Sequence, residues 1–129
     1  MATRREARER ALALCYELEA KGETPDALLA ELPAPPDEYT VTLLRGVGDH
    51  RAELDQLLGR FSERWAVERM PAVDRALLRI GSYELGWQPD LPVGVVIDEA
   101  VELAHQYSTH DSGRFVHALL ARIADQVRS

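Results

Sequence analysis

The feature that most constrains the fold is a helical period in the apolar residues that recurs along nearly the whole chain. Between residues 3 and 20, arginine and glutamate alternate with apolar residues spaced three and four apart, namely Ala7, Ala11, Leu14 and Leu18. The same spacing recurs in segments 37–61, 71–85, 92–104 and 109–127. Such spacing places apolar side chains on one face of an α-helix. The only strand-like run, residues 93–97, merges into a helical period, so the sequence predicts an all-α fold of about six or seven helices.

Glycine and proline mark the expected ends of the first helices. Gly22 should stop the first helix, and Thr24 followed by Pro25 should open a short second helix that ends near Leu32. Residues 33–36 hold three prolines. This linker is too short to separate independent domains, so a single domain is expected.

Two glycines lie inside the third helical segment. Gly46 and Gly48 each cost roughly 1 kcal/mol relative to alanine in a helix, so we expect either a bend or a close helix–helix contact there. Residues 62–70 should form a connection with one helical turn around Trp65, and Pro71 should open the next helix.

Length and composition exclude several classes of protein. The chain has 129 residues, 46% of them hydrophobic, which suits one globular domain with an ordinary core. No uncharged apolar run approaches the roughly 18 residues that a membrane span needs. The single Cys15 cannot form an internal disulfide. The arginine-rich N-terminus lacks the apolar stretch of a secretory signal peptide. We therefore expect a cytoplasmic protein.

The charge is unevenly distributed. The net charge is −7, but the first ten residues hold four arginines and two glutamates, so they carry +2 and the rest of the chain carries −9. Of the 15 basic residues, 14 are arginine and only Lys21 is lysine. Arginines at positions 4, 5, 8 and 10 could bind successive phosphates of a nucleic acid strand. The alternative is a solvated first helical turn with weak Glu–Arg pairs.

No pattern of catalytic or metal-binding residues is present in the sequence. Glu99, Glu102 and His105 share one helical face, but a di-metal bundle site needs a second Glu-x-x-His pair, so a solvated polar face is expected. Cys15 lies among apolar residues and is expected to be a buried small hydrophobe. The sequence contains no glycine-rich nucleotide loop. We expect no enzymatic activity, no cofactor and no metal.

Three blocks of sequence resemble the NusB transcription antitermination family. The first is the arginine-rich opening, residues 4–16; the second is residues 73–85, VDRALLRIGSYEL; and the third combines residues 91–104 with 111–120. The blocks occur in the family's order and cover most of the chain. Only residues 21–36 have no expected counterpart, and the sequence leaves their role open.

The resemblance implies an all-helical protein of two packed helical bundles, with an N-terminal subdomain of about residues 1–66 and a C-terminal subdomain of about 67–129. It also implies a function in transcription antitermination, without catalysis. Members of this family bind boxA RNA of ribosomal RNA operon leaders as a single strand, together with NusE, a small-subunit ribosomal protein. The complex then joins elongating RNA polymerase.

Position by position, the resemblance implies two groups of contact residues. The residues that match RNA contacts are Arg4, Arg5, Arg8, Asp111, Arg114 and Phe115. The residues that match positions facing NusE are Tyr16, Glu68 and Asp74. Glu6 stands where relatives often extend the basic run, which leaves the RNA affinity of this end open. Periodicity also allows Phe115 to be a core residue and Tyr16 to be an ordinary half-buried aromatic.

Two alternatives to a stand-alone antitermination factor stay open. The same fold occurs as an accessory domain of ribosomal RNA cytosine methyltransferases, although a chain that begins with Met1 and lacks a glycine-rich motif is expected to stand alone. A protein–protein module or homodimer that covers its own RNA face is the other alternative.

Overall fold

The computed structural model describes residues 2–128, and every regular element in that range is helical. The elements are α1 (Arg4–Lys21), α2 (Pro25–Glu31), α3 (Glu38–Asp49), α4 (Arg51–Phe61), the 3₁₀ turn η1 (Val67–Arg69), α5 (Ala72–Trp87), α6 (Val93–Tyr107) and α7 (Ser112–Val127). The predicted all-α fold is confirmed. None of the helices in this range is both long and apolar enough to cross a membrane.

The ends of α1 follow from local sequence. The Thr3 side chain accepts a hydrogen bond from the Glu6 amide, and the Glu6 carboxylate accepts one from the Thr3 amide, which is a reciprocal capping box. At the other end Gly22 adopts a left-handed conformation with φ of 67°, and its amide donates to the Leu18 carbonyl. Both ends of α1 agree with the prediction to within about one residue.

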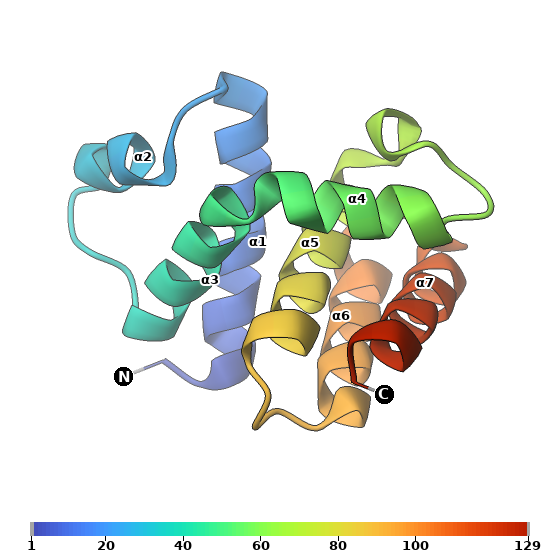
Figure 1. Cartoon of the computed structure of the whole chain (residues 1–129). Helices are drawn as coiled ribbons and strands as arrows, with labels where there is room; N and C mark the ends of the chain where they lie inside the picture. Colours follow the sequence, from blue (N-terminus) through green and yellow to red (C-terminus); the bar gives the residue numbers. More distant parts are fainter. Residues whose placement is uncertain (1, 129) are drawn as a thin grey trace.

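The third predicted segment is two helices rather than one. It breaks at His50, between α3 and α4, and Figure 1 shows the change of direction. The two glycines before the break make close contacts. A Cβ on Gly46 would lie 2.2 Å from the Tyr83 ring, and one on Gly48 would lie 2.3 Å from Pro25. Gly46 thus lets α3 approach α5, and Gly48 lets α2 lie against α3.

The connection after α4 differs slightly from the prediction. The helical turn lies at Val67–Arg69 rather than around Trp65, whose backbone amide donates a hydrogen bond to the Ser62 hydroxyl. Ser62 and Trp65 exchange two hydrogen bonds that close this turn. Pro71 then precedes α5, as predicted.

Helix α5 is the centre of the molecule. Residues 76–85 are all buried, and α5 packs against α1, α3, α4, α6 and α7. In Figure 1, α1, α2 and α3 lie on one side of α5, α6 and α7 lie on the other, and α4 runs across α5 towards α7. One hydrophobic cluster extends from Ala7 in α1 to Ala124 in α7. The division into two subdomains near residue 66 stays a prediction, because this core is shared by both halves.

Candidate nucleic-acid and partner interface

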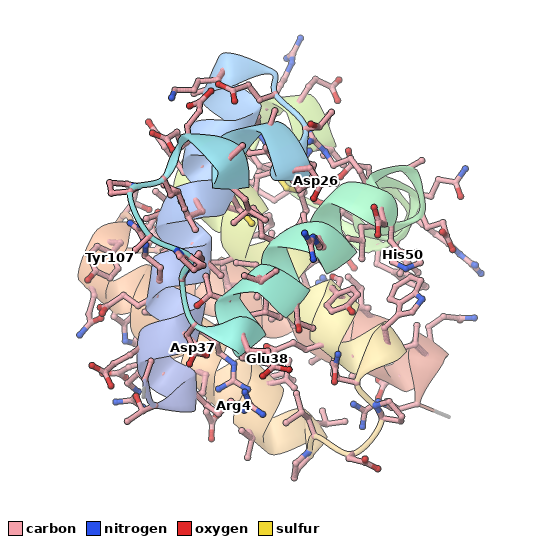
Figure 2. All side chains as sticks on the ribbon, turned by 90° about the vertical axis from the view of Figure 1, so that its left-hand side faces the viewer. Arg4, Asp26, Asp37, Glu38, His50 and Tyr107 are labelled. Atoms are coloured by element: carbon pink, nitrogen blue, oxygen red, sulfur yellow. The ribbon has the colours of Figure 1, made fainter. Side chains whose placement is uncertain are left out.

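The first turn of α1 presents Arg4 and Arg5 to solvent. Figure 2 shows Arg4 beside the start of α3, near Asp37 and Glu38. The Arg4 guanidinium carbon lies 3.9 Å from the centroid of the Tyr39 ring, which is a cation–π contact. Arg4 therefore stays exposed while its guanidinium rests on a buried aromatic ring.

Arg5 is paired with the neighbouring helix α6. Its Nη2 lies 2.6 Å from Oε2 of Glu99, and its Nε donates to the same oxygen at 3.1 Å. The Arg5 side chain is still 60% exposed, whereas Glu99 is only 18% exposed. The hydrogen bond and the charge of Glu99 raise the pKa of Arg5. Glu99, which the sequence predicted to lie on a solvated polar face, is thus a partner of the arginine cluster.

Arg8 does not lie on the exposed surface where the resemblance placed it. Its side chain is 4% exposed and forms an ion pair with Glu84 of α5, with Nη2 to Oε2 at 2.9 Å and Nε to Oε1 at 3.1 Å. Tyr39 donates a short hydrogen bond to the same carboxylate. One helical turn separates Arg4 from Arg8, but Arg8 is buried against side chains of α3, α5 and α6.

Glu6 interrupts the basic run for a structural reason. Its carboxylate completes the capping box, and the hydrogen bonds with Thr3 lower the pKa of Glu6. A carboxylate in the first turn also interacts favourably with the helix dipole. Glu6 therefore stabilises the turn that carries Arg4 and Arg5.

The start of α7 carries the second set of predicted RNA residues. Asp111 and Arg114 are exposed, while Phe115 is half-buried and packs against the hydrophobic core. Asp111 and Phe115 line a small cavity of about 50 Å³ together with Arg64 and Trp65. The core contact predicted for Phe115 is thus present, and its predicted contact with RNA stays a prediction.

The predicted partner residues separate into exposed and buried groups. Tyr16 is 49% exposed and borders a groove of about 360 Å³ with Leu12, Val73 and Tyr107. Glu68 is exposed and borders a different cleft. Tyr16 and Glu68 are therefore accessible to a partner.

Asp74 is the exception among the predicted partner residues. It is 2% exposed and accepts hydrogen bonds from Ser108 and Ser112, the latter at 2.8 Å. Its carboxylate holds the turn between α6 and α7 rather than facing solvent. The start of α7, where Asp111 and Arg114 lie, is anchored by this contact.

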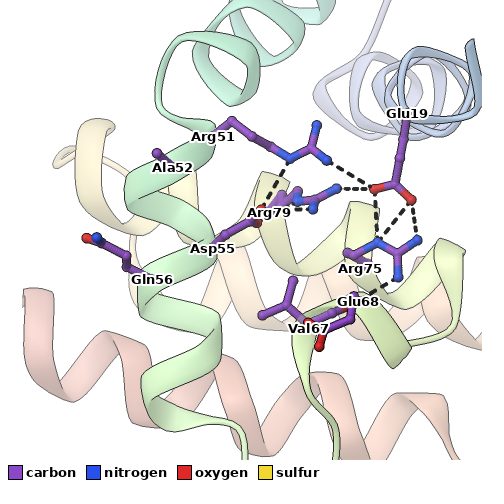
Figure 3. A pocket seen from close by; sticks show the side chains of 9 residues that line it. All are labelled: Glu19, Arg51, Ala52, Asp55, Gln56, Val67, Glu68, Arg75 and Arg79. Atoms are coloured by element: carbon purple, nitrogen blue, oxygen red, sulfur yellow. Dashed lines mark hydrogen bonds and ion pairs between the residues drawn. The ribbon is translucent and has the colours of Figure 1, made fainter. Parts of the chain in front are cut away.

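The cleft beside Glu68 is lined by an ion-pair network (Figure 3). Its volume is about 560 Å³. Glu19 of α1 accepts from Arg75 and Arg79 of α5, and Asp55 of α4 accepts from Arg79 and Arg51. The arginines lower the pKa of Glu19 to about 2. The network joins three helices, and its three arginines share two carboxylates.

Cys15, which the sequence predicted to be a buried small hydrophobe, is buried. Burial raises the pKa of the Cys15 thiol to about 12, which disfavours the thiolate form. Among residues 2–128, no group of three or more His, Cys, Asp or Glu side chains is placed to hold a metal ion.

Three residues around the arginines could not be assigned a role from the sequence. They are Tyr39, Glu84 and Tyr107. The Tyr39 hydroxyl donates to Glu84. The Tyr107 hydroxyl of α6 donates to Glu9 of α1. A weak signal existed for Glu84, because a carboxylate in the largely apolar segment 76–85 needs a cationic partner if it is buried. Nothing in the sequence identified Arg8 as that partner.

Comparisons with known proteins identify the relatives of this chain. The NusB family profile matches residues 5–125. The transcription antitermination protein NusB of Kineococcus radiotolerans is 47% identical over 130 residues, covering 97% of this chain and 95% of that protein.

Two solved structures share the fold. NusB of T. maritima is 33% identical, with a TM-score of 0.85 over 97% of this chain and 92% of that one. A NusB solved with NusE and double-stranded RNA is 26% identical, with a TM-score of 0.82 over 95% and 96% of the two chains. The chain belongs to the NusB family of transcription antitermination proteins.

Proposed function

We propose that this protein is an antitermination factor that binds boxA RNA of ribosomal RNA operon leaders together with NusE and then joins elongating RNA polymerase in the cytoplasm. The observation that carries the proposal is the exposed pair Arg4 and Arg5 on a chain that otherwise carries −9. Family membership supports it, as does the related NusB solved with NusE and RNA.

The proposed RNA contacts differ in kind. Arg4, Arg5 and Arg114 supply cationic groups for phosphates, which contribute affinity without reading sequence. Phe115 offers a ring edge or face for stacking with a base, and Asp111 offers an acceptor for a base amino group. Arg8 is not included among the contacts, because its guanidinium is committed to Glu84 inside the protein.

The proposed NusE surface is the groove beside Tyr16. Leu12, Val73 and Tyr107 supply apolar area, and Glu9 lines the groove with negative charge. Glu68 would add negative charge from the exposed edge of the other cleft. Ribosomal proteins are usually basic, so opposite charge would speed encounter. Asp74 would act indirectly in this proposal, by fixing the α6–α7 turn.

The test is a fluorescence anisotropy titration with boxA RNA, with a scrambled RNA and with a duplex, each with and without NusE. Replacing Arg4 and Arg5 by alanine should weaken boxA binding at least tenfold. A matched control replaces Arg45 and Arg60, which are exposed on α3 and α4, and removes the same charge. Equal affinity for boxA and scrambled RNA, or equal losses in both double variants, would contradict the proposal. Light scattering beforehand separates the monomer from a homodimer that covers this face.

A further inference from the structure

The two exposed arginines in the first turn of α1 are held by side chains that connect to one buried ion pair. Arg4 rests on the Tyr39 ring, and the Tyr39 hydroxyl donates to Glu84. Arg5 donates to Glu99, whose other oxygen lies 3.7 Å from Nη1 of Arg8. We call this set of side chains the arginine-anchoring network; it consists of Arg4, Arg5, Arg8, Tyr39, Glu84 and Glu99.

The network joins four helices. Arg8 of α1 and Glu84 of α5 form its centre, with side chains that are 4% and 2% exposed. Tyr39 comes from α3 and Glu99 from α6. Residues 39, 84 and 99 lie far from the first turn of α1 in sequence, so the contacts depend on how the helices pack.

We propose that Tyr39 and Glu99 are positioning residues for RNA binding, which fix Arg4 and Arg5 in the orientation that meets phosphates. This inference rests on the proposed RNA-binding function. Tyr39 and Glu99 themselves make no RNA contact in it. They act through the arginines, and the buried Arg8–Glu84 pair fixes them in turn.

The physical basis is the rotamer freedom of arginine. An exposed arginine that must become ordered on binding loses side-chain entropy, and that loss weakens affinity. A guanidinium already held against a ring or a carboxylate has lost most of this freedom before RNA arrives. The Glu99 contacts use Nε and Nη2 of Arg5 and therefore leave Nη1 for a phosphate oxygen.

A second possibility for Glu99 is competition with phosphate for Arg5. The two roles predict opposite results. Loss of a positioning carboxylate lowers RNA affinity, whereas loss of a competing carboxylate raises it and steepens the salt dependence. The low exposure of Glu99 and its proximity to Arg8 favour positioning, because part of its charge is already compensated inside the protein.

The Glu99 test is a double-mutant cycle with Arg5. Glu99→Gln should weaken boxA binding about two- to tenfold, which corresponds to ordering one long side chain. In an Arg5→Ala background, Glu99→Gln should have no further effect, because its action passes through Arg5. Glu102→Gln, an exposed carboxylate on the same helix, is the matched control and should not weaken binding. Tighter binding by Glu99→Gln, or an equal effect with and without Arg5, would overturn the proposal.

The Tyr39 test separates the ring from the hydroxyl. Tyr39→Phe keeps the surface under Arg4 and should bind within about twofold of wild type, whereas Tyr39→Leu should lose about two- to tenfold. The loss should disappear in an Arg4→Ala background. Circular dichroism melts of every variant show whether it folds, and affinities are compared only after correction for the folded fraction. Equal affinities of the Phe and Leu variants would overturn this half of the proposal.

The same variants distinguish a failure of the proposed RNA site from a failure of the proposed positioning role. If Arg4→Ala and Arg5→Ala leave RNA affinity unchanged, the proposed RNA site is wrong. If these variants lose affinity but Tyr39→Leu and Glu99→Gln do not, RNA binding stands and only the positioning role is wrong.

Discussion

Three arginines lie within five positions of α1, and their burial decides their different roles. Arg4 and Arg5 remain at the surface, while Arg8 pairs with Glu84 in the interior. A buried pair is costly to break, because removal of one partner leaves an uncompensated charge in the core. A loss of RNA binding in an Arg8 variant would therefore reflect a destabilised fold rather than the loss of an RNA contact.

Replacing Arg8 by methionine should lower the free energy of unfolding by about 3–5 kcal/mol, since Glu84 would be left buried without its cation. Arg10→Met on the exposed side of the same helix should change stability by less than about 0.5 kcal/mol. Urea denaturation followed by circular dichroism measures both. Similar losses for the two variants would show that the Arg8–Glu84 pair contributes little.

Gly46 is a second residue whose role depends on a neighbour distant in sequence. An added methyl group would collide with the Tyr83 ring, so Gly46→Ala should destabilise the protein by about 1–3 kcal/mol. Gly86→Ala is the control, because open space surrounds that position and alanine favours helix by about 1 kcal/mol. Thermal melts should thus move in opposite directions. A melting temperature for Gly46→Ala at or above that of wild type would contradict the packing argument.

At the scale of helices, ion pairs fix how the elements sit against one another. Glu19 links α1 to α5, and Asp55 links α4 to α5. Because the pKa of Glu19 is about 2 in the folded chain against an ordinary 4.5, its ionised form stabilises the fold above pH 4.5. That contribution is lost as the pH falls from 4.5 towards 2.

Glu19→Gln should cost about 1–2 kcal/mol at pH 7, a value reduced by the partial exposure of the network. The difference between wild type and variant should shrink as the pH falls below 4.5 and should nearly vanish near pH 2. Urea titrations at several pH values measure it. A difference that stays constant across this range would mean that the ionised carboxylate is not what stabilises the contact.

The α6–α7 turn depends on one buried carboxylate. Asp74→Ala removes the acceptor for Ser108 and Ser112, so the turn should open more readily. Amide hydrogen exchange should accelerate at residues 108–113 more than in the rest of the chain. Any loss of NusE or RNA binding in this variant would then follow from a displaced α7 start. Unchanged exchange in that turn would point to a direct role for Asp74.

Across the whole molecule, the number of accessible arginines sets the salt dependence of RNA binding. Four arginines on phosphates would give a slope of log K against log[salt] near −3, but Arg8 is buried. With Arg4, Arg5 and Arg114 as the contacts, the slope for this protein alone should be about −2. Anisotropy titrations from low to moderate salt measure it. A slope near −3 would indicate a fourth cation at the interface.

The sequence by itself determined the helical class, the ends of most helices and the uneven charge. These properties follow from local rules, namely the spacing of apolar residues and the glycine and proline at helix ends. Its family resemblance, carried by three blocks in order, was confirmed by the comparisons.

Only the tertiary structure decided which charged residues are accessible. Arg8 and Asp74 occupy positions that the family motif marks for contact, yet both are buried, because α5 passes beneath α1 and beside the α6–α7 turn. Periodicity places a residue on a helix face, but it does not say which other helix covers that face. The partners Glu84, Tyr39 and Glu99 come from three other helices. Their proximity to the arginines is a property of packing, which no local pattern in the sequence encodes.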